Sequence, residues 1–285
     1  MNQPVAIVTG ANRGIGYAIV KALCGKFHGY VYLTSRNVKR GLEAVKSLEN
    51  EGFIAKFHQL DISDRDSVRN FAEYLKKEHK GVDVLVNNAA ILEWDAIFPT
   101  YEVAKRTIDN NYKSLLLIEE FIYPLLKNGA KVVNVCSAAG HLSNLRNTQW
   151  IETLKQKDLT VEKINEFVDS YLESVRNGTF RKEDFADGGK HAEFRVAKVA
   201  VAALSMIQAR KYKDRHISIN LVHPGHVKTD MANGGGVIEP DDATKGVQYL
   251  IFEASPNLSG TFMWHDGKMI DWYYEGDDMY LTGLW

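Results

Sequence analysis

The sequence predicts an α/β protein built on a doubly wound parallel sheet. Short apolar runs alternate with helical patterns along the 285 residues, and this alternation favours repeated β-α-β units. Several runs, such as Val84-Leu85-Val86, are apolar without interruption, which is typical of strands that helices cover on both faces. A glycine-rich segment also separates the first strand from the first helix. We therefore expect a single domain over 1–285.

Seven strands and six main helices follow from these patterns. The strands are expected over 5–9, 30–35, 54–60, 82–87, 130–136, 217–222 and 260–264. The helices are expected over 14–23, 40–51, 64–77, 103–126, 193–212 and 242–252. Asp64 is a good N-cap for the third helix, and Asp66 is favourable near the positive end of its dipole.

Two segments fall outside the alternation. Residues 141–190 form a polar insertion that is helix-prone over 162–175 and ends in the loop-like Asp187-Gly188-Gly189. The insertion is too polar for a core of its own, so we expect it to pack across the mouth of the sheet, where open α/β folds bind ligands. Residues 265–285 form a C-terminal extension rich in aromatic side chains. This extension either covers a pocket or hydrophobic groove, or fills the edge beside the last strand.

Composition and charge exclude several classes of function. The chain has 35 Lys and Arg against 36 Asp and Glu, a formal net charge of -1, so it lacks the basic surface that nucleic-acid binding requires. Its longest apolar run, 199–204, is far shorter than the ~20 residues that cross a bilayer. Two cysteines, Cys24 and Cys136, are too few for a disulfide framework, and the first residues lack the pattern of a signal peptide. We expect a cytoplasmic protein that binds neither nucleic acid nor membrane.

The glycine-rich segment predicts a dinucleotide site. Gly10, Gly14 and Gly16 permit a tight turn and close backbone approach, and the helix that follows offers free N–H groups to a pyrophosphate. At the end of the second strand, where NAD binding requires an acidic residue, the sequence has Arg36. The guanidinium groups of Arg36 and Arg13 would attract a 2'-phosphate. NADPH is therefore favoured over NADH as the cofactor.

Further segments make the chain resemble the short-chain dehydrogenase/reductases over nearly its full length. They are the glycine-rich loop, Asn87-Asn88-Ala89-Ala90 after the fourth strand, Ser137 after the fifth strand and Lys198 on a later helix. Within that superfamily, segments 36–41, 57–62 and 132–137 are similar to those of the monomeric carbonyl reductases. The resemblance implies a Rossmann-like fold and a monomer, because the long insertion before the catalytic helix covers the surface used for oligomerisation in that group.

The resemblance also assigns the cofactor contacts. Asp61 and Ile62 would bind the adenine, residues 87–89 the adenosine side, and residues 224–229 the nicotinamide and its carboxamide. The full set of expected contacts is Gly10, Asn12, Arg13, Gly14, Ile15, Gly16, Arg36, Asp61, Ile62, Asn87, Asn88, Ala89, Lys198, Pro224, Gly225, Val227 and Thr229.

For the chemistry, the resemblance points to Asn111, Ser137, Phe194 and Lys198. Asn111 would support a water-linked proton relay, Ser137 would hydrogen-bond the substrate carbonyl oxygen, and Lys198 would hold the nicotinamide ribose and lower the pKa of the neighbouring acid. These roles suit the reaction, because hydride arriving at a carbonyl carbon leaves negative charge on the oxygen, which needs donors and an acid. Lys198 also borders the apolar run 199–204, where an unpaired charge is costly.

The proton donor of the family pattern is absent. That pattern is Tyr-x-x-x-Lys, whereas this sequence reads Phe194-Arg195-Val196-Ala197-Lys198. Phenylalanine keeps the ring but loses the O–H, so the general-acid contribution of about 10²- to 10⁴-fold should largely vanish. Three explanations stay open: a substitution introduced to trap a complex, a natural reductase of conjugated C=C bonds that works without the phenol, or a protein that binds NADPH without turnover.

The substrate side is less well defined. Candidate contacts are Trp94, Phe98, His141, Trp150, His226 and Met231. Such a lining suits an apolar carbonyl compound or enone, and His226 could orient or protonate a substrate or simply bond to the loop backbone. His223 and His226 flank a Pro-Gly turn without a further ligand cluster, so no metal is expected. The predicted function is NADPH-dependent reduction of an apolar ketone, aldehyde or quinone, disabled in this chain by Phe194.

Overall fold

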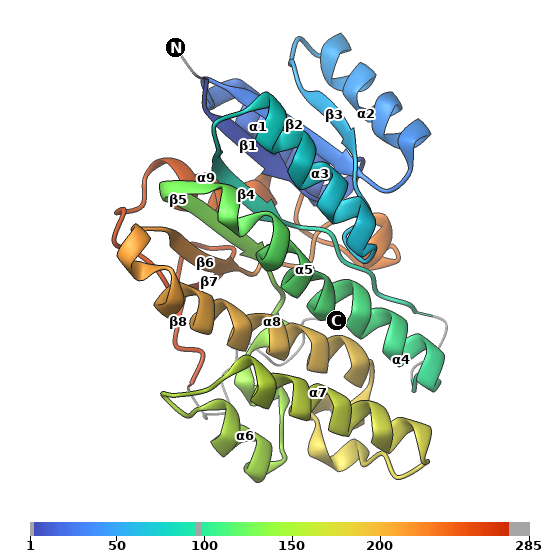
Figure 1. Cartoon of the computed structure of the whole chain (residues 1–285). Helices are drawn as coiled ribbons and strands as arrows, with labels where there is room; N and C mark the ends of the chain where they lie inside the picture. Colours follow the sequence, from blue (N-terminus) through green and yellow to red (C-terminus); the bar gives the residue numbers. More distant parts are fainter. Residues whose placement is uncertain (1–2, 95–97, 274–285) are drawn as a thin grey trace.

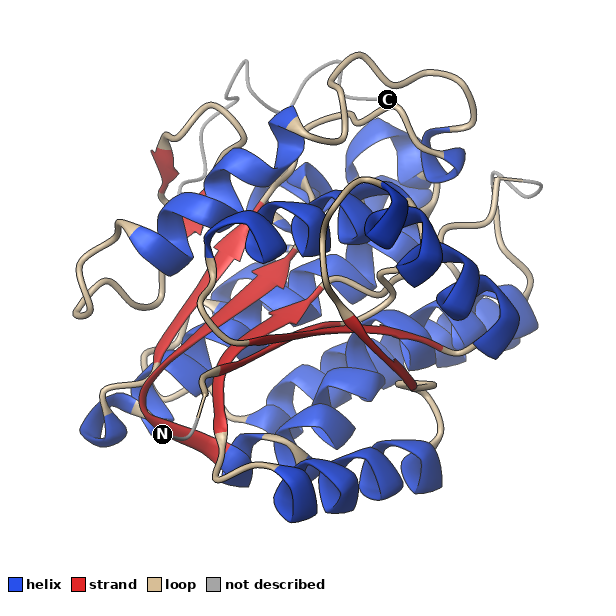
Figure 2. Cartoon of the chain, turned by 90° about the horizontal axis from the view of Figure 1, so that it is seen from above, coloured by secondary structure: helices blue, strands red, loops and turns tan. Residues whose placement is uncertain are grey.

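In the computed structural model, which describes residues 3–94 and 98–273, an eight-stranded sheet lies between two layers of helices (Figure 1, Figure 2). The strands are β1 (Val5–Val8), β2 (Tyr30–Ser35), β3 (Lys56–Gln59), β4 (Val82–Asn87), β5 (Leu126–Val135), β6 (Ser218–Val222), β7 (Phe262–Met263) and β8 (Met269–Ile270). Their order is β3-β2-β1-β4-β5-β6-β7-β8, and only the β7–β8 pair is antiparallel within the described chain. The predicted doubly wound α/β fold is confirmed.

Both faces of the sheet are buried under helices. One face packs against α1 (Gly14–Lys26), α2 (Val38–Asn50) and α9 (Lys245–Phe252), and the other against α3 (Arg65–Glu78), α5 (Ser114–Phe121) and α8 (Ala192–Lys211). In β1, Ala6 and Val8 point to the first face, whereas Val5 and Ile7 point to the second. A strand buried on both sides needs apolar residues at every position, which explains the uninterrupted apolar runs. No helix in the described ranges is long and apolar enough to cross a bilayer.

The topology places a ligand site between β1 and β4. From β1 the chain moves outward through β2 to β3, then returns to the other side of β1 to form β4. The loops after β1 and β4 therefore run in opposite directions, and a crevice opens at the carboxyl ends of these strands. The glycine-rich loop follows β1, and Asn88 follows β4, so both border this crevice.

Several elements lie close to their predicted ranges. The bounds of β2 and β4 agree with the predicted 30–35 and 82–87, and α3 begins one residue after Asp64. Asp64 caps this helix as predicted, because its carboxylate accepts hydrogen bonds from the N–H groups of Asp66 and Ser67.

The single helix predicted over 103–126 is wrong. The structure instead has α4 (Tyr101–Ile108), a π-helical turn (Asp109–Lys113) and α5, and β5 already begins at Leu126. Within the π-helical turn, the Asn111 side chain accepts from the N–H of Ile91 and donates to its carbonyl, both at 2.8 Å. The change in helical pitch thus occurs where Asn111 binds the loop that follows β4. Pro124 lies in the 3-10 turn that follows α5.

The insertion over 141–190 packs beside the helix layer. It contains α6 (Thr148–Leu154) and α7 (Val161–Arg176), and α7 runs alongside α4 and α8 (Figure 1). One apolar stripe of α7 is buried and includes Ile164, Phe167, Val168, Tyr171 and Leu172. The expectation that the insertion lies across the mouth of the sheet is wrong. Its stripe joins the main hydrophobic core instead, so that α8 is buried on its outer side as well.

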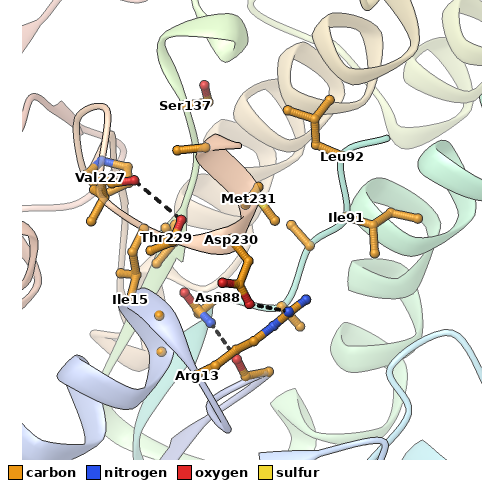
Figure 3. A pocket seen from close by; sticks show the side chains of 18 of the residues that line it. Arg13, Ile15, Asn88, Ile91, Leu92, Ser137, Val227, Thr229, Asp230 and Met231 are labelled. Carbon is orange, nitrogen blue, oxygen red and sulfur yellow. Dashed lines mark hydrogen bonds and ion pairs between the residues drawn. The ribbon is translucent and has the colours of Figure 1, made fainter. Parts of the chain in front are cut away.

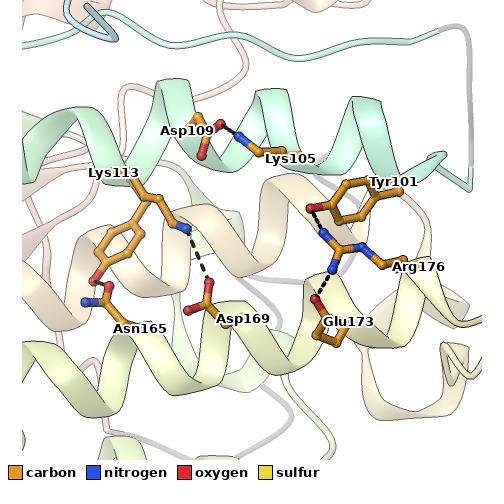
Figure 4. Close-up of polar contacts among 9 residues, drawn as sticks. Tyr101, Lys105, Asp109, Lys113, Asn165, Asp169, Glu173 and Arg176 are labelled. Carbon is orange, nitrogen blue, oxygen red and sulfur yellow. Dashed lines mark hydrogen bonds and ion pairs between the residues drawn. The ribbon is translucent and has the colours of Figure 1, made fainter. Parts of the chain in front are cut away.

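Polar contacts hold α7 to the helix beside it (Figure 4). Lys113 Nζ lies 3.2 Å from Asp169 Oδ1. Arg176 donates to the Tyr101 hydroxyl and lies 2.6 Å from a carboxylate oxygen of Glu173. Such exposed ion pairs contribute little to stability, so the apolar stripe is the main reason for this docking.

The described part of the C-terminal extension lies at the sheet edge. β8 pairs with β7, and the Trp272 indole is buried and donates to the Gly140 carbonyl at 2.7 Å. This part therefore fills the edge beside the last parallel strand, one of the two expected alternatives. The rest of the predicted extension, 274–285, lies outside the described residues.

Candidate active site

A cavity of about 540 Å³ opens at the carboxyl ends of the strands (Figure 3). Of the residues predicted for the site, those that line it are Gly10, Asn12, Arg13, Gly14, Ile15, Gly16, Arg36, Asp61, Ile62, Asn88, Ala89, Trp94, Ser137, Phe194, Lys198, Pro224, Gly225, His226, Val227, Thr229 and Met231. The structure thus brings together, from most of the length of the chain, the residues predicted for cofactor, catalysis and substrate.

The loop after β1 forms a cradle that only glycine fits. Gly10 and Gly14 have φ of 62° and 57°, a region that side chains disfavour. A Cβ on Gly10 would lie 2.7 Å from Ala89 Cα, and one on Gly16 would lie 2.5 Å from Asn88 Nδ2. α1 begins at Gly14, and no side chain caps its first N–H groups. The loop therefore presents unpaired backbone donors and a positive helix end to the cavity, a suitable place for a pyrophosphate.

The loop after β4 fixes this cradle from the other side. Asn88 Nδ2 donates to the carbonyls of Thr9 and Gly10 at 2.9 and 3.1 Å. The N–H groups of Asn88 and Ala89 donate to Thr9 Oγ1 at 3.0 and 3.1 Å. These four contacts make the cradle a rigid unit before any ligand binds.

We expect Gly16→Ala to destabilise this unit. The new methyl group would lie 2.5 Å from Asn88 Nδ2 and 2.7 Å from the Gly10 carbonyl oxygen. The cradle must therefore shift, which lowers the free energy of unfolding by about 2 kcal/mol. Urea unfolding followed by circular dichroism measures the change. The matched control is Gly25→Ala on the same helix, where the nearest atom is Phe53 Cε1 at 3.8 Å. That variant should gain about 0.5–1 kcal/mol from helix propensity, and equal losses in both variants would contradict the argument.

Two cations and a short acidic loop border the outer end of the cavity. Arg36 follows β2 and Arg13 precedes α1, and both line the cavity. Asp61 and Ile62 follow β3 in the same wall. The Asp61 carboxylate accepts from the N–H and hydroxyl of Ser63 at 3.0 and 2.7 Å. Arg36 and Arg13 therefore bring positive charge to this end of the cavity, which suits an anionic group.

Ser137, Phe194 and Lys198 meet at the inner end. Phe194 and Lys198 are four residues apart on α8 and so share one helix face. Lys198 Nζ donates to the Val135 carbonyl at 3.0 Å and lies 5.6 Å from the centre of the Phe194 ring. Burial lowers the pKa of Lys198, and no carboxylate in the described ranges forms an ion pair with it. Ser137 Oγ accepts from the Ala139 N–H at 3.2 Å, so its own proton remains available to a ligand oxygen.

Phe194 lies in the cavity wall and has no proton to offer. Its side chain is almost fully buried, so the ring packs as a phenol ring would without its hydroxyl. Its neighbour Glu193 is fully buried, and burial raises the pKa of this carboxyl to about 7. Glu193 does not line the cavity; its carboxylate lies 3.7 Å from His191 Nδ1. Glu193 therefore does not replace the missing acid.

Sequence analysis missed the structural role of His223. This buried histidine follows β6, and its Nδ1 accepts from the Ala138 N–H at 3.1 Å. Burial, together with the nearby His265, His226 and Lys198, lowers the pKa of His223 to about 3. The ring is therefore neutral and supports the backbone beside Ser137. A polar residue directly after an apolar strand run was the available signal. In the described chain no three His, Cys, Asp or Glu side chains are grouped to hold a metal.

Five predicted residues lie away from the cavity. Asn87 is buried and donates to Asn134 Oδ1 at 2.8 Å, so it links β4 to β5. Asn111 is occupied by the Ile91 backbone, as described above. His141 is also buried, between Ser143 Oγ at 2.8 Å and the Asp271 carbonyl at 2.9 Å, so it stabilises the sheet edge rather than a substrate.

The other two are aromatic. Trp150 packs on Phe167 inside the insertion, with ring centres 5.4 Å apart. Phe98 is more than half exposed. An aromatic residue suits a pocket and a core equally well, so the sequence alone does not show which of the two surrounds Trp150 or Phe98.

Comparisons with known proteins agree with this geometry. The family model of short chain dehydrogenase matches residues 4–149. Carbonyl reductase [NADPH] 1 of Sus scrofa is 37% identical over 279 residues, which cover 95% of both chains. The rat protein of the same name is 36% identical, over 87% of this chain and 91% of its own.

Solved structures are similar over comparable lengths. Salutaridine reductase from Papaver somniferum superposes with a TM-score of 0.83 and 28% identity, over 91% of this chain and 99% of that one. Menthone neomenthol reductase from Mentha piperita superposes with a TM-score of 0.78 and 26% identity, over 93% and 99%.

Proposed function

Because the chain belongs to the short-chain dehydrogenase/reductase family, we propose that it reduces the carbonyl group of an apolar ketone, aldehyde or quinone. It is an NADPH-dependent oxidoreductase similar to the carbonyl reductases. The observation that carries the proposal is a single cavity lined by the glycine cradle, Ser137, Phe194 and Lys198. We further propose a monomer, because α7 covers the outer face of α4 and α8, and a cytoplasmic location.

The residues of the cavity fit NADPH. The backbone donors of the glycine loop would hold the pyrophosphate, and the close approach at Gly10 and Gly16 leaves room for backbone contact only. Arg36 and Arg13 would bind the 2'-phosphate, and Asp61 with Ile62 would border the adenine.

The segment after β6 would bind the other half of the cofactor. Pro224, Gly225, Val227 and Thr229 line the cavity next to Lys198, so the backbone of this segment would hold the nicotinamide and the ammonium its ribose. When bound, NADPH supplies the hydride.

The remaining chemistry belongs to the side chains of the inner end. Negative charge develops on the substrate oxygen as the carbonyl is reduced. Ser137 would donate a hydrogen bond to that oxygen, and the buried Lys198 ammonium would stabilise the charge. Phe194 supplies no proton, so the proton must come from water. We infer that carbonyl reduction is correspondingly slow in this chain.

A conjugated enone is the second candidate substrate. Hydride addition to its β-carbon gives an enolate, which needs hydrogen-bond donors more than an immediate strong acid. The favouring observation is that Ser137 and Lys198 line the cavity while Phe194 lacks the acid. A third alternative is that the chain binds NADPH without turnover.

The test is NADPH oxidation by the unmodified chain with ketones, quinones and enones, followed by identification of the products. Slow formation of alcohols supports the carbonyl reductase, and saturated ketones support the enone reductase. NADPH binding without any product supports the non-catalytic alternative.

Arg36→Gln should weaken NADPH binding by about tenfold to thirtyfold. A charge-assisted contact to phosphate is worth about 1.5–2 kcal/mol, and NADH, which has no 2'-phosphate, should bind within about twofold of the unmodified chain. Titration by coenzyme fluorescence measures both constants. Arg69→Gln, an exposed arginine on α3 outside the cavity, serves as the control. Equal losses for NADPH and NADH would refute the proposed phosphate contact.

A further inference from the structure

An ion pair joins the two rims of the cofactor cleft (Figure 3). Arg13 Nη1 lies 2.6 Å from Asp230 Oδ2, although the two residues are 217 positions apart. Arg13 precedes α1, and Asp230 begins the short turn Asp230–Ala232 that follows Thr229. Both residues line the cavity. Their side chains are 63% and 76% exposed, so solvent and solutes have access to the pair.

The turn that carries Asp230 is tied to the opposite wall as well. Trp94, in the loop after β4, donates its indole N–H to the Met231 carbonyl at 2.7 Å. On the other side, a Cβ on Gly14 would lie 3.1 Å from Thr229 Cγ2, so the start of the turn touches the glycine loop. The turn therefore lies between the phosphate end and the substrate end of the cavity. The ion pair between Asp230 and Arg13 joins this turn to the phosphate end of the cavity.

We propose that Asp230 is a coenzyme-selectivity residue that competes with the coenzyme's 2'-phosphate for Arg13. This inference rests on the proposed NADPH site. A guanidinium has a planar set of donors that suits a carboxylate or a phosphate, and Arg13 cannot make its best contacts with both. An exposed pair is worth at most about 1 kcal/mol, so a phosphate that also meets Arg36 displaces the carboxylate. NADH has no such phosphate and leaves the pair intact.

Two consequences follow from this competition. Asp230 lowers the affinity for NADPH by the free energy of the pair and by repulsion between carboxylate and phosphate. The same release frees the Asp230 end of the turn, whose other end bears the contact between Met231 and Trp94.

The experiment is a double-mutant cycle on coenzyme affinity. Dissociation constants for NADPH and NADH are measured by fluorescence titration at low salt for the unmodified chain, Asp230→Asn, Arg13→Gln and the double variant. We expect Asp230→Asn to tighten NADPH binding by about threefold to fivefold and to change NADH binding by less than about twofold. In the Arg13→Gln background, Asp230→Asn should change NADPH binding by less than about twofold. The gain should also shrink at high salt, because the charges are exposed.

An exposed ion pair outside the cavity provides the matched control. Lys245 Nζ lies 2.8 Å from Asp242 Oδ1, with side chains that are 72% and 56% exposed, and neither residue lines the cavity. Asp242→Asn removes the same charge and should leave both dissociation constants within about twofold.

Several results would contradict the inference. Unchanged or weaker NADPH binding in Asp230→Asn overturns the inference, and so does an equal gain in the Arg13→Gln background, which would be a general effect of charge. If the unmodified chain does not bind NADPH at all, the proposed function fails and this inference fails with it. NADPH binding without the Arg13-dependent gain overturns the inference alone.

Discussion

Replacing Phe194 with tyrosine should raise kcat/KM for carbonyl reduction by about 10²- to 10⁴-fold. The ring of Phe194 is already buried in the cavity wall, 5.6 Å from the Lys198 ammonium. The change adds a single oxygen at the edge of that ring, next to a positive charge that lowers the pKa of a phenol. The new hydroxyl can then give its proton to the substrate oxygen. Steady-state NADPH oxidation with a panel of ketones and quinones measures the gain.

Two further variants identify the cause of that gain. Phe252→Tyr places the same group on α9, outside the cavity, and should leave the activity within about twofold. Adding Lys198→Met to Phe194→Tyr should remove most of the gain, because the phenol then loses the neighbouring positive charge.

The opposite results are equally informative. If the unmodified chain already reduces enones and tyrosine adds nothing, Phe194 belongs to the chemistry of a C=C reductase. If neither protein turns over any substrate while both bind NADPH, the chain is a binding protein.

Glu193→Gln should stabilise the folded protein at neutral and alkaline pH by about 3 kcal/mol. The Glu193 carboxyl is fully buried, and burial raises its pKa from 4.5 to about 7. Between these two values the folded state holds a proton that the unfolded state has released, so stability falls as the pH rises from 4.5 to 7. The loss is complete above pH 7. A shift of this size corresponds to about 3 kcal/mol.

The measurement is the free energy of unfolding in urea from pH 4.5 to 8.5. The unmodified protein and Glu193→Gln should agree near pH 4.5 and separate as the pH rises, because glutamine stays neutral. Glu166→Gln, an exposed carboxyl on α7, should follow the unmodified protein within about 0.5 kcal/mol. A constant difference between Glu193→Gln and the unmodified chain at all pH values would show that ionisation of Glu193 is not the cause.

Much of the fold and of the phosphate loop could be predicted from the sequence because those features are local. All of β1 and Val84-Leu85-Val86 of β4 are continuous apolar runs, and such runs are typical of strands that are buried on both faces. Gly10, Gly14 and Gly16 lie where a strand passes into a helix, so their spacing alone indicates close backbone approach. The positions of Phe194 and Lys198 on one helix face follow equally from helical periodicity.

The predicted residues that lie outside the cavity depend on contacts between distant parts of the chain. His141 has the composition of a pocket residue but is held by the Asp271 carbonyl, 130 positions away. Asn111 interrupts a helix through the backbone of Ile91. The insertion was expected at the mouth of the sheet because its sequence is polar. The sequence does not show that its apolar stripe packs on α4 and α8.

The sequence by itself thus determined the α/β class and the glycine-rich loop with its preference for NADPH, and it predicted that Phe194 stands where the family pattern has tyrosine. Only the tertiary structure decided that α7 docks on α4 and α8, that His223 supports the backbone beside Ser137, and that Asp230 faces Arg13. The physical reason is the range of the interactions. Backbone conformation and periodicity are set by residues a few positions apart, whereas a partner for a buried or charged group is chosen among all surfaces that the folded chain brings together.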